Sequence, residues 1–527
     1  MPITASILET AAAHPERLAL AGDGEALGYA ALVEDSRRVF AVVDALHAES
    51  GERAPRPAAE TRGIPITAVS VRSAFHTARI LAGLSGYRAV SATLDPRWPL
   101  QHRVRVVLAT GIGVVIADDP ALADALAAAG WGGRILGLDE FRARERTAVP
   151  AAPPCVRAPD EAFLLLFSSG TTSDPKAFLK TRAQYRANLA VSSAHLEPGP
   201  GVVTLAPGPV SYSLTLYAVI ECLGTGGAAH LADAFSPFAL AARIAEAGVS
   251  RVVAVPAVVQ AIADAARRDP AACATLDLVV TGGAHLSAAL RDALAQALPA
   301  VRLISYYGAA EIGFIGDSRG GDGSRIAVYP GIGAAIRDAA GAALPDGEIG
   351  TLWISADACS DGYLAGTSPT QLRGPDGWAS VGDQGRLIGG ELELLGRAGD
   401  IAVTGGHKVA LPEVERAFAG MPGIGEACAV ALPHARLGSV VALVVEEAPD
   451  AASSPSTRTD PSTRADHSTR ADPSIRAALA ARAAERLAPQ FVPRRWYRIA
   501  RLPRTVGGKI RRGETAEAIA DGRAVRL

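Results

Sequence analysis

The chain has 527 residues, of which 52 are Lys or Arg and 54 are Asp or Glu, so its formal net charge is −2. This length exceeds what one hydrophobic core normally organises, which predicts at least two domains. The near-neutral charge argues against binding to nucleic acid or to a membrane surface through basic residues, so we expect no nucleic-acid partner. With 49% hydrophobic and 20% charged residues, the chain has the composition of a globular protein rather than a disordered one.

Three further absences narrow the class of protein. No apolar run reaches the ~18–20 residues that a membrane span needs. The first residues, MPITASILETAAAHPER, lack the basic and apolar regions of a secretory signal. The five cysteines lie far apart and form no CxxC pair, which argues against a disulfide framework or a zinc site. We therefore expect a cytoplasmic globular protein.

Lysine is scarce in this chain. Only four of the 52 basic residues are lysines, namely Lys176, Lys180, Lys408 and Lys509. An ammonium is a compact point charge and a guanidinium is a broad planar fork, so some sites accept only lysine. Chance survival is a competing explanation for any one of them. Because the four fall in three segments that contain glycine or proline, we take them as markers of special chemistry.

Secondary-structure patterns alternate along the first two thirds of the chain, weakly over 1–150 and clearly from about 163 to 308. Strands are predicted at 202–207, 228–233, 251–256, 276–283 and 302–308. Helices are predicted between them at 238–248, 258–268 and 287–298. This alternation predicts an α/β fold with largely parallel sheets. From 324 to about 395, short strands and turns predict a small β subdomain.

A small α+β region follows the segment GRAGD. Its predicted elements are a helix at 411–418, strands at 426–432 and 440–447, a helix at 475–487 and a strand at 495–500. The repeat STRTDP-STRADH-STRADP-SIRA at 456–477 cannot bury a core, so we expect a disordered surface insertion at 453–474. A docking role for this repeat is the alternative.

The expected domains follow from these patterns. We expect a large N-terminal domain at 1–396 with parallel-rich sheets, helices and the small β subdomain. A hinge is expected at 397–400, and a small mobile α+β domain at 401–527.

The segment LLLFSSGTTSDPKAF (164–178) is the first that carries chemistry. An apolar strand runs directly into hydroxyl side chains, a glycine and Lys176. Glycine lets the backbone approach a ligand closely, while hydroxyls and exposed N–H groups cradle phosphate oxygens. It is not a Walker motif, because GxxxxGK[ST] occurs nowhere in the chain. An ordinary polar turn is the alternative.

Four later segments each hold one conspicuous residue or glycine cluster. Glu311 follows a predicted strand in SYYGAAEIGF, where ligands of open α/β sheets collect. Asp383 lies between glycines in VGDQGR, placed to accept the hydroxyls of a ribose. The glycines of GRAGDIAVTGGHKVALPEVE favour a hinge, and Lys509 follows a glycine pair in LPRTVGGKIRR. The alternatives are a solvated glutamate at a helix start, a capped turn, a plain linker and a solvent-facing lysine.

Taken in order, these five segments closely resemble the motifs of the acyl-adenylate-forming, or AMP-binding, superfamily. SSGTTSDPK resembles its phosphate loop TSGTTGxPKG, YGAAE its YGxTE, and GDQG its TGDxG. The segments at 396–415 and 502–510 resemble its hinge and its C-terminal lysine motif. The resemblance extends from about residue 5 to 520 and is to acyl-CoA synthetases and fatty-acid–CoA ligases in particular.

The resemblance implies two half-reactions. A carboxylate attacks the α-phosphate of MgATP to give an acyl-adenylate and pyrophosphate, and a thiol then displaces AMP. By family position, the catalytic residues would be Lys509, Glu311 and Thr171, with Glu311 binding Mg²⁺. The residues implied to hold the nucleotide are Ser168, Ser169, Gly170, Thr172, Lys176, Gly282, Gly283, Ala284, Tyr307, Gly308, Asp383 and Arg397.

The resemblance also implies domain alternation. The C-terminal domain would rotate at Gly399 and Asp400, and the segment with Gly405, Gly406 and Lys408 would then line a thiol tunnel. Some positions depart from the family pattern. They are Gly399 in place of the usual Asp or Lys, Ala310 in place of a hydroxyl residue, and Ser173 and Ala177 in place of loop glycines. None of these removes a charged catalytic group.

The segment 206–217 resembles the acyl pocket of the superfamily, with Tyr212 at a position that is often His. Tyr212 and Leu216 are the expected lining. No acidic residue lies between Thr204 and Ile220, which disfavours an α-amino acid and favours an aliphatic or aromatic acid, a fatty acid above all. If Tyr212 and Leu216 only pack in the core, they carry no such information.

We expect ATP and Mg²⁺ as cofactors and CoA as the thiol. Since no carrier domain follows residue 527, a separate acyl carrier protein with its phosphopantetheine is the alternative acceptor. A degenerate nucleotide-binding homologue without turnover ranks third, motivated by Ala310 and the stiffer loop. The sequence does not indicate an oligomeric state.

The repeat gives the first testable prediction. Deleting residues 456–473 should leave solubility and activity close to those of the full chain, because the segment lacks the apolar residues needed to pack against a core. Sedimentation and turnover of the two chains would check this. A collapse of either quantity would show that the repeat is not a passive insertion.

Overall fold

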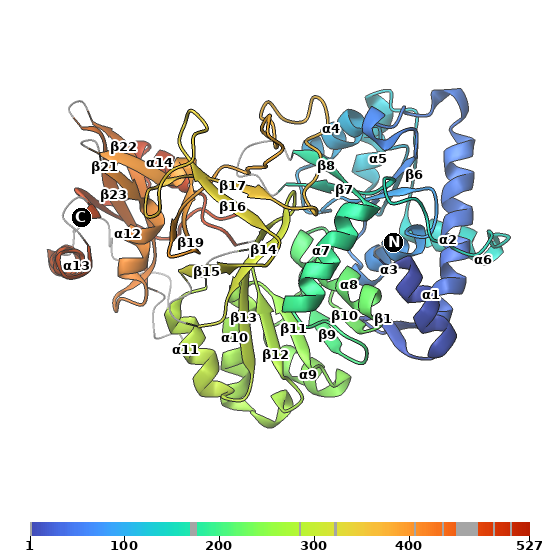
Figure 1. The fold of residues 1–527 in the computed structure, drawn as a ribbon, viewed down its shortest axis with the longest axis horizontal. Helices are drawn as coiled ribbons and strands as arrows, with labels where there is room; N and C mark the ends of the chain where they lie inside the picture. The colour runs from blue at the N-terminus through green and yellow to red at the C-terminus, as the bar shows by residue number, and fades with distance from the viewer. Residues whose placement is uncertain are drawn as a thin grey trace, which may run out of the picture. The chain divides into compact units, whose positions relative to one another are not determined.

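The structure is a computed structural model that describes residues 3–168, 176–283, 286–320, 324–404, 407–434, 437–448, 473–487, 491–505 and 508–527. Figure 1 shows its helices and strands. The chain divides into two compact units, Met1–Ala334 with Trp353–Val381 and Ala335–Leu352 with Gly382–Leu527. The segment predicted as a small β subdomain is thus shared between the two units. The expected domain boundary at 397–400 stays a prediction.

The first sheet of unit 1 has the strand order β6-β5-β3-β4-β7-β8. Its strands are β3 (Ile66–Ser70), β4 (Val90–Thr93), β5 (Val114–Ala117), β6 (Arg134–Leu136), β7 (Ala162–Phe167) and β8 (Ala177–Thr181). Five of them run parallel, whereas β8 returns antiparallel to β7. All residues of β3, β4 and β5 are buried, as expected for a parallel sheet covered on both faces.

Helices accompany this sheet and the N-terminal end of the chain. They are α1 (Thr4–Ala13), α2 (Tyr29–Glu49), α3 (Ala74–Leu84), α4 (Leu100–Thr110), α5 (Pro120–Ala128) and α6 (Leu138–Thr147). Ser73 and Asp119 cap α3 and α5 through their side chains. The weak alternation over 1–150 therefore does correspond to α/β structure.

The second sheet of unit 1 contains the strands that the sequence predicted best. They are β9 (Val203–Ala206), β10 (Ala228–Leu231), β11 (Arg251–Ala254), β12 (Leu278–Thr281) and β13 (Arg302–Ala309). These strands and β1 (Leu18–Gly22) run parallel in the order β13-β12-β11-β9-β10-β1. Antiparallel neighbours flank them: β2 (Glu25–Gly28) at one end, and β14 (Gly313–Ser318) followed by β15 (Arg325–Val328) at the other.

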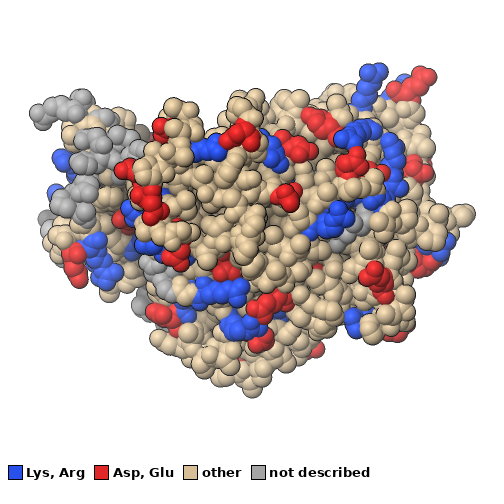
Figure 2. Space-filling view, viewed as in Figure 1, with Lys and Arg blue, Asp and Glu red and all other residues tan. Residues whose placement is uncertain are grey.

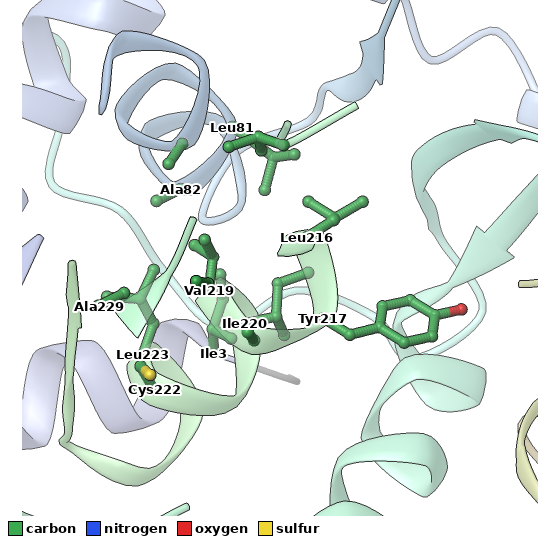
Figure 3. Packing of buried hydrophobic residues seen from close by; sticks show 14 of the residues in the cluster. Ile3, Leu81, Ala82, Leu216, Tyr217, Val219, Ile220, Cys222, Leu223 and Ala229 are labelled. Carbon is green, nitrogen blue, oxygen red and sulfur yellow. The ribbon is translucent and has the colours of Figure 1, made fainter. Parts of the chain in front are cut away.

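The helices associated with this sheet are α7 (Arg182–His195), α8 (Ser213–Thr225), α9 (Leu240–Ala247), α10 (Pro256–Arg268) and α11 (Ala288–Ala297). The last three confirm the helices predicted at 238–248, 258–268 and 287–298, whereas α7 and α8 were not predicted. Helix α8 is buried along most of its length, and Figure 3 shows its Leu216 and Val219 on the side of Leu81, whereas the ring of Tyr217 points away from them. The alternation of strand and helix brings the carboxyl ends of the parallel strands to one edge of the sheet.

Unit 2 holds a mixed sheet with the strand order β21-β20-β23-β24-β25, in which β22 also pairs with β23. Its strands are β20 (Ile401–Thr404), β21 (His407–Ala410), β22 (Ile424–His434), β23 (Gly438–Glu447), β24 (Arg495–Ile499) and β25 (Val525–Arg526). Its helices are α12 (Leu411–Phe418), α13 (Pro473–Arg486) and α14 (Arg512–Ala520). Helix α12 has the predicted bounds.

The remaining strands are neighbours in the order β16 (Gly333–Arg337), β17 (Gly350–Ser355), β18 (Asp383–Ile388) and β19 (Glu391–Arg397), and β18 pairs antiparallel with both β17 and β19. Of the expected insertion at 453–474, residues 453–472 lie outside the described residues. Helix α13 begins at Pro473, so the last two residues of the expected insertion belong to this helix. A deletion that ends at residue 472 therefore leaves α13 whole.

The distribution of charged side chains and the hydropathy of the helices bear on the expectations from the sequence. Figure 2 shows acidic and basic side chains intermixed over the viewed face. Within the described residues, no helix is both long enough and apolar enough to cross a membrane.

A buried ion pair in unit 1 gives the second testable prediction. Arg251 at the start of β11 donates to Glu221 of α8 at 2.7 Å, and both side chains are almost fully buried. Arg251→Ala would leave the Glu221 charge uncompensated and should lower the free energy of unfolding by ~3–5 kcal/mol. Urea unfolding measures this.

Arg302→Ala is the matched control. Arg302 pairs with Glu197 and Asp277, but about half of its side chain is exposed, so its loss should cost less than ~1 kcal/mol. Equal effects of the two substitutions would contradict the importance assigned to burial.

Candidate active site

The two ends of the predicted phosphate loop are held together by the β7–β8 hairpin. The N–H of Ser168 donates to the carbonyl of Lys176 at 2.9 Å, and the N–H of Lys176 donates to Oγ of Ser168 at 3.3 Å. Ser169, Gly170, Thr171, Thr172 and Ser173 lie outside the described residues. The hairpin thus fixes where the loop begins and ends. Ala177, which departs from the family glycine, is buried in β8.

Lys176 is the predicted site residue that follows the undescribed part of the loop. Its Nζ donates to Oγ1 of Thr370 at 2.8 Å and lies 4.9 Å above the ring centre of Tyr363. A cation over an aromatic face is held in orientation by the electrons of the ring. The lysine is therefore anchored by the segment around residues 363–370, which is distant in sequence.

Glu311 lies in the turn between β13 and β14 rather than at a helix start. Its side chain is buried, with 6% of the residue exposed, so the solvated alternative does not apply. Oε1 of Glu311 accepts a hydrogen bond of 3.0 Å from the hydroxyl of Tyr363. Tyr363 thus connects Lys176 to Glu311. Tyr363 was not among the site residues expected from the sequence.

Lys180 was not predicted as a site residue, yet it contacts the same turn. Its Nζ donates to the carbonyl oxygens of Glu311 at 2.8 Å and of Ala358 at 2.5 Å. Burial lowers the pKa of Lys180 to about 8. The scarcity of lysine in the chain was the sequence signal for it, but Lys180 lies just outside the recognised motifs.

The residues around Glu311 fit a Mg²⁺ ion that arrives with a nucleotide. Within the described residues, no cluster of three or more His, Cys, Asp or Glu side chains forms a metal cage. Mg²⁺ is commonly held by one or two carboxylates together with phosphate oxygens and water. A single oriented carboxylate such as Glu311 therefore matches MgATP better than a resident metal.

Four of the residues predicted to hold the nucleotide lie on, or directly after, two adjacent strands. Gly282 and Gly283 come directly after β12, while Tyr307 and Gly308 lie on β13, its parallel neighbour. A Cβ atom at Gly282 would lie 2.5 Å from the ring of Tyr306. The close packing therefore requires glycine there. Ala284 lies outside the described residues.

The two predicted acyl-pocket residues have different environments. Leu216 is fully buried in the main core of unit 1 (Figure 3). Tyr212 is half-buried at the start of α8, with the guanidinium of Arg97 5.6 Å from its ring centre. Burial and the Asp95 carboxylate raise the pKa of Tyr212. Leu216 thus has the surroundings of a core residue, and a pocket role for either side chain stays a prediction.

Unit 2 brings together three predicted residues from distant motifs. Asp383 and Arg397 face each other across the β18–β19 pair, with Nε of Arg397 3.3 Å from Oδ1 of Asp383. Desolvation and the positive charge of Arg397 lower the pKa of Lys509, while the carboxylate of Asp383 opposes this shift. Lys509 therefore lies within the electrostatic reach of both.

The predicted hinge residues lie in a short 3-10 helix, Ala398–Asp400. The carboxylate of Asp400 accepts from the backbone N–H of Arg397 at 2.9 Å and from Nε of Arg512 at 2.6 Å. Gly399 has open space where a side chain would project. Gly405 and Gly406 lie outside the described residues, as does the side chain of Lys408, whose backbone belongs to β21.

Solved structures share this fold. The chain resembles ATP-bound MatB from Rhodopseudomonas palustris with a TM-score of 0.81 at 22% identity, covering 97% of both chains. It resembles o-succinylbenzoate CoA synthetase (MenE) from Bacillus subtilis with a TM-score of 0.80 at 18% identity, again covering 97% of both chains. The α/β fold is that of the adenylate-forming enzymes.

Sequence comparison gives the family. Residues 7–364 match the AMP-binding enzyme family, and residues 413–509 match the AMP-binding enzyme C-terminal domain. The chain belongs to the AMP-binding enzyme family and is an acid–thiol ligase of the acyl-adenylate-forming superfamily.

Curated relatives differ in the acceptor named for them. The chain is 29% identical to fatty acid–[acyl-carrier-protein] ligase MmaC of Mycobacterium marinum, over 85% of this chain and 87% of MmaC. It is 25% identical to the uncharacterized acyl–CoA ligase YhfT of Bacillus subtilis, over 67% of this chain and 68% of YhfT. It is also 28% identical to salicyl-AMP ligase / salicyl-S-ArCP synthetase of Mycobacterium tuberculosis, over 82% of this chain and 79% of that protein.

Two glycines around the predicted hinge give the third testable prediction. Gly399→Asp should leave the unfolding midpoint nearly unchanged, because a side chain there meets open space. Gly396→Ala should lower the free energy of unfolding by ~1–3 kcal/mol, because Gly396 has φ of +114° and its Cβ would lie 2.9 Å from that of Asp400. Comparing both variants in one unfolding assay checks the contrast, which an equal loss would contradict.

Proposed function

We propose that the chain is an ATP-dependent ligase that activates an aliphatic or aromatic carboxylic acid as acyl-AMP and transfers the acyl group to CoA. A fatty acid is the first choice of substrate. The observation that carries the proposal is the chain of contacts from Lys176 through Tyr363 to Glu311. It joins a cation suited to phosphate with a buried carboxylate suited to a metal–nucleotide complex.

In the adenylation step, positioning and charge neutralisation supply most of the acceleration. In this proposal the loop residues Ser168 to Thr172 and Lys176 hold the β- and γ-phosphates. Tyr363 orients Glu311, which would hold Mg²⁺. When bound, the ion would neutralise charge on the phosphate oxygens. Buried Glu311 meets little competing water, which strengthens its interaction with a cation.

The residues of unit 2 supply the remaining roles in the proposal. Asp383 would accept hydrogen bonds from the ribose hydroxyls, and Arg397 would hold the nucleotide. Lys509 would donate to the substrate carboxylate and to the ribose–phosphate oxygens, stabilising the charge that develops as the new C–O–P bond forms and pyrophosphate leaves. An ammonium suits this narrow two-sided contact better than a guanidinium fork.

The acceptor has one alternative with specific support. MmaC, which the chain matches over most of both lengths, is named as a fatty acid–[acyl-carrier-protein] ligase. Loading of a separate carrier protein is therefore the second candidate function. In either case the thiol would displace AMP from the same adenylate. A cytoplasmic location stays a prediction.

Pyrophosphate release tests the proposal directly. Wild-type chain with MgATP should release pyrophosphate with aliphatic or aromatic acids, and mass spectrometry should detect an acyl-CoA when CoA is present. Release without any acyl-CoA, followed by acylation of an added acyl carrier protein, would support the alternative. No release with any acid, despite measurable ATP binding, would contradict both and favour a degenerate nucleotide-binding homologue.

Lys509→Ala gives a sharper test of one role. The substitution should abolish adenylation while leaving ATP binding and thioester formation from preformed acyl-adenylate largely intact, because Lys509 acts only where the acid meets the phosphate. Single-turnover assays of the two half-reactions separate these effects. Arg511→Ala, close in sequence and paired with Glu514, is the control. Equal loss of both half-reactions in Lys509→Ala would contradict the role.

A further inference from the structure

Lys180 is the lysine that the recognised motifs leave out. It lies on β8, four residues after Lys176, which immediately precedes this strand. Lys176 is partly exposed, whereas only 1% of Lys180 is exposed. The two lysines are therefore close in the chain, but Lys176 meets solvent whereas Lys180 is enclosed in the interior.

The buried ammonium is held by backbone oxygens. Nζ of Lys180 donates to the carbonyls of Glu311 and Ala358, at 2.8 and 2.5 Å, and it makes no ion pair within the described part of the chain. Burying an ammonium without a paired carboxylate is costly. A methionine of similar length would avoid that cost, so the stability of the core does not explain why a lysine is present.

We infer that Lys180 is a positioning residue for Glu311. By holding the carbonyls of Glu311 and Ala358, it fixes the turn that carries Glu311 against the segment that carries Tyr363. This fixes the distance over which the Tyr363 hydroxyl reaches the Glu311 carboxylate. The inference rests on the proposed function, in which Glu311 meets Mg²⁺ that is bound to ATP.

The surrounding contacts show why one nitrogen has this effect. The N–H of Ser360 also donates to the carbonyl of Glu311 at 2.8 Å, and Oγ of Ser360 donates to the carbonyl of Leu179 at 2.8 Å. Arg373 holds the carbonyls of Cys359 and Ser360. The segment 358–363 is therefore hydrogen-bonded to β8 at two successive residues, Leu179 and Lys180. Of these two residues, Lys180 directly joins the carbonyl of Ala358 to that of Glu311.

The geometry also explains why this residue is a lysine in a chain that otherwise uses arginine. Two carbonyl oxygens approach a single nitrogen that is excluded from solvent. A guanidinium is larger and presents its donors as a planar fork, so it would push the two segments apart. The position requires a small cation.

Calorimetric titration of ATP, with Mg²⁺ and separately with EDTA, tests the inference without needing the acid substrate. For Lys180→Met, ATP affinity in EDTA should stay near that of the wild type, while the gain in affinity from Mg²⁺ should fall by about 10–100-fold. A merely structural role would alter both titrations or neither. A folded Lys180→Met chain with the full Mg²⁺ gain would overturn the inference.

Arg182→Met is the matched control. Arg182 is also buried and donates to two backbone carbonyls, those of Ser85 and Tyr87, but it has no contact with Glu311 among its hydrogen bonds. Its loss should lower the unfolding midpoint and leave the Mg²⁺ gain unchanged. If Arg182→Met lost the Mg²⁺ gain as Lys180→Met does, general destabilisation would explain both and the inference would be wrong.

Two further variants make the result decisive. Lys180→Gln, whose amide can donate to one of the two carbonyls, should show an intermediate loss and serves if Lys180→Met does not fold; a wild-type Mg²⁺ gain in it would overturn the inference. In a double-mutant cycle of Lys180→Met with Tyr363→Phe, the two losses of the Mg²⁺ gain should not add, because both substitutions act through Glu311. Full additivity of the two losses would contradict this. A wild-type chain without any Mg²⁺ gain would instead contradict the proposed function.

Discussion

The orientation of one buried carboxylate, Glu311, is the constraint on which the site in unit 1 depends. A carboxylate on an exposed turn would sample many directions, whereas Glu311 is buried and accepts a hydrogen bond from Tyr363. The turn itself is set by the antiparallel pairing of β13 and β14. The ring of Tyr363 in turn lies beneath Lys176, so the end of the β7–β8 hairpin that is proposed to bind phosphate is held near the same carboxylate. Fold and site are therefore linked through very few contacts.

The sequence predicted the parts of this arrangement that depend on local patterns. Helix α12 has the predicted bounds, and each predicted strand from β9 to β13 is present, because apolar periodicity is a local property. The motif residues Lys176, Glu311, Asp383, Arg397 and Lys509 were located by type and order alone. The sequence shows a glycine at position 282, but only the fold reveals why it is required, namely that the ring of Tyr306 lies where a Cβ atom would project.

Contacts between distant segments could not be predicted in the same way. The contact of Tyr363 with Glu311 joins residues that are 52 positions apart, and that of Lys180 with Ala358 joins residues 178 apart. The role of Leu216 could not be predicted either, because an apolar residue near a motif has the same sequence pattern whether it lines a pocket or packs in the core. Composition gave the sequence signal for Lys180, because lysine is rare in this chain, but no local pattern reveals that its partners are Glu311 and Ala358.

The contacts in unit 2 determine where a conformational change can be absorbed. Asp400 is held by Arg512, which also pairs with Glu415 and donates to the carbonyl of Ala429. These contacts attach Asp400 to the mixed sheet and its helices. Arg397 is anchored by Asp383 through the β18–β19 pair. Ala398 and Gly399 lie between these two anchors, and within the described part of the chain one hydrogen bond spans them, from the N–H of Arg397 to the carboxylate of Asp400. A rotation within this segment would break that single hydrogen bond, whose net contribution is ~0.5–3 kcal/mol. A glycine at 399, with open space around it, keeps the steric cost of such a rotation low.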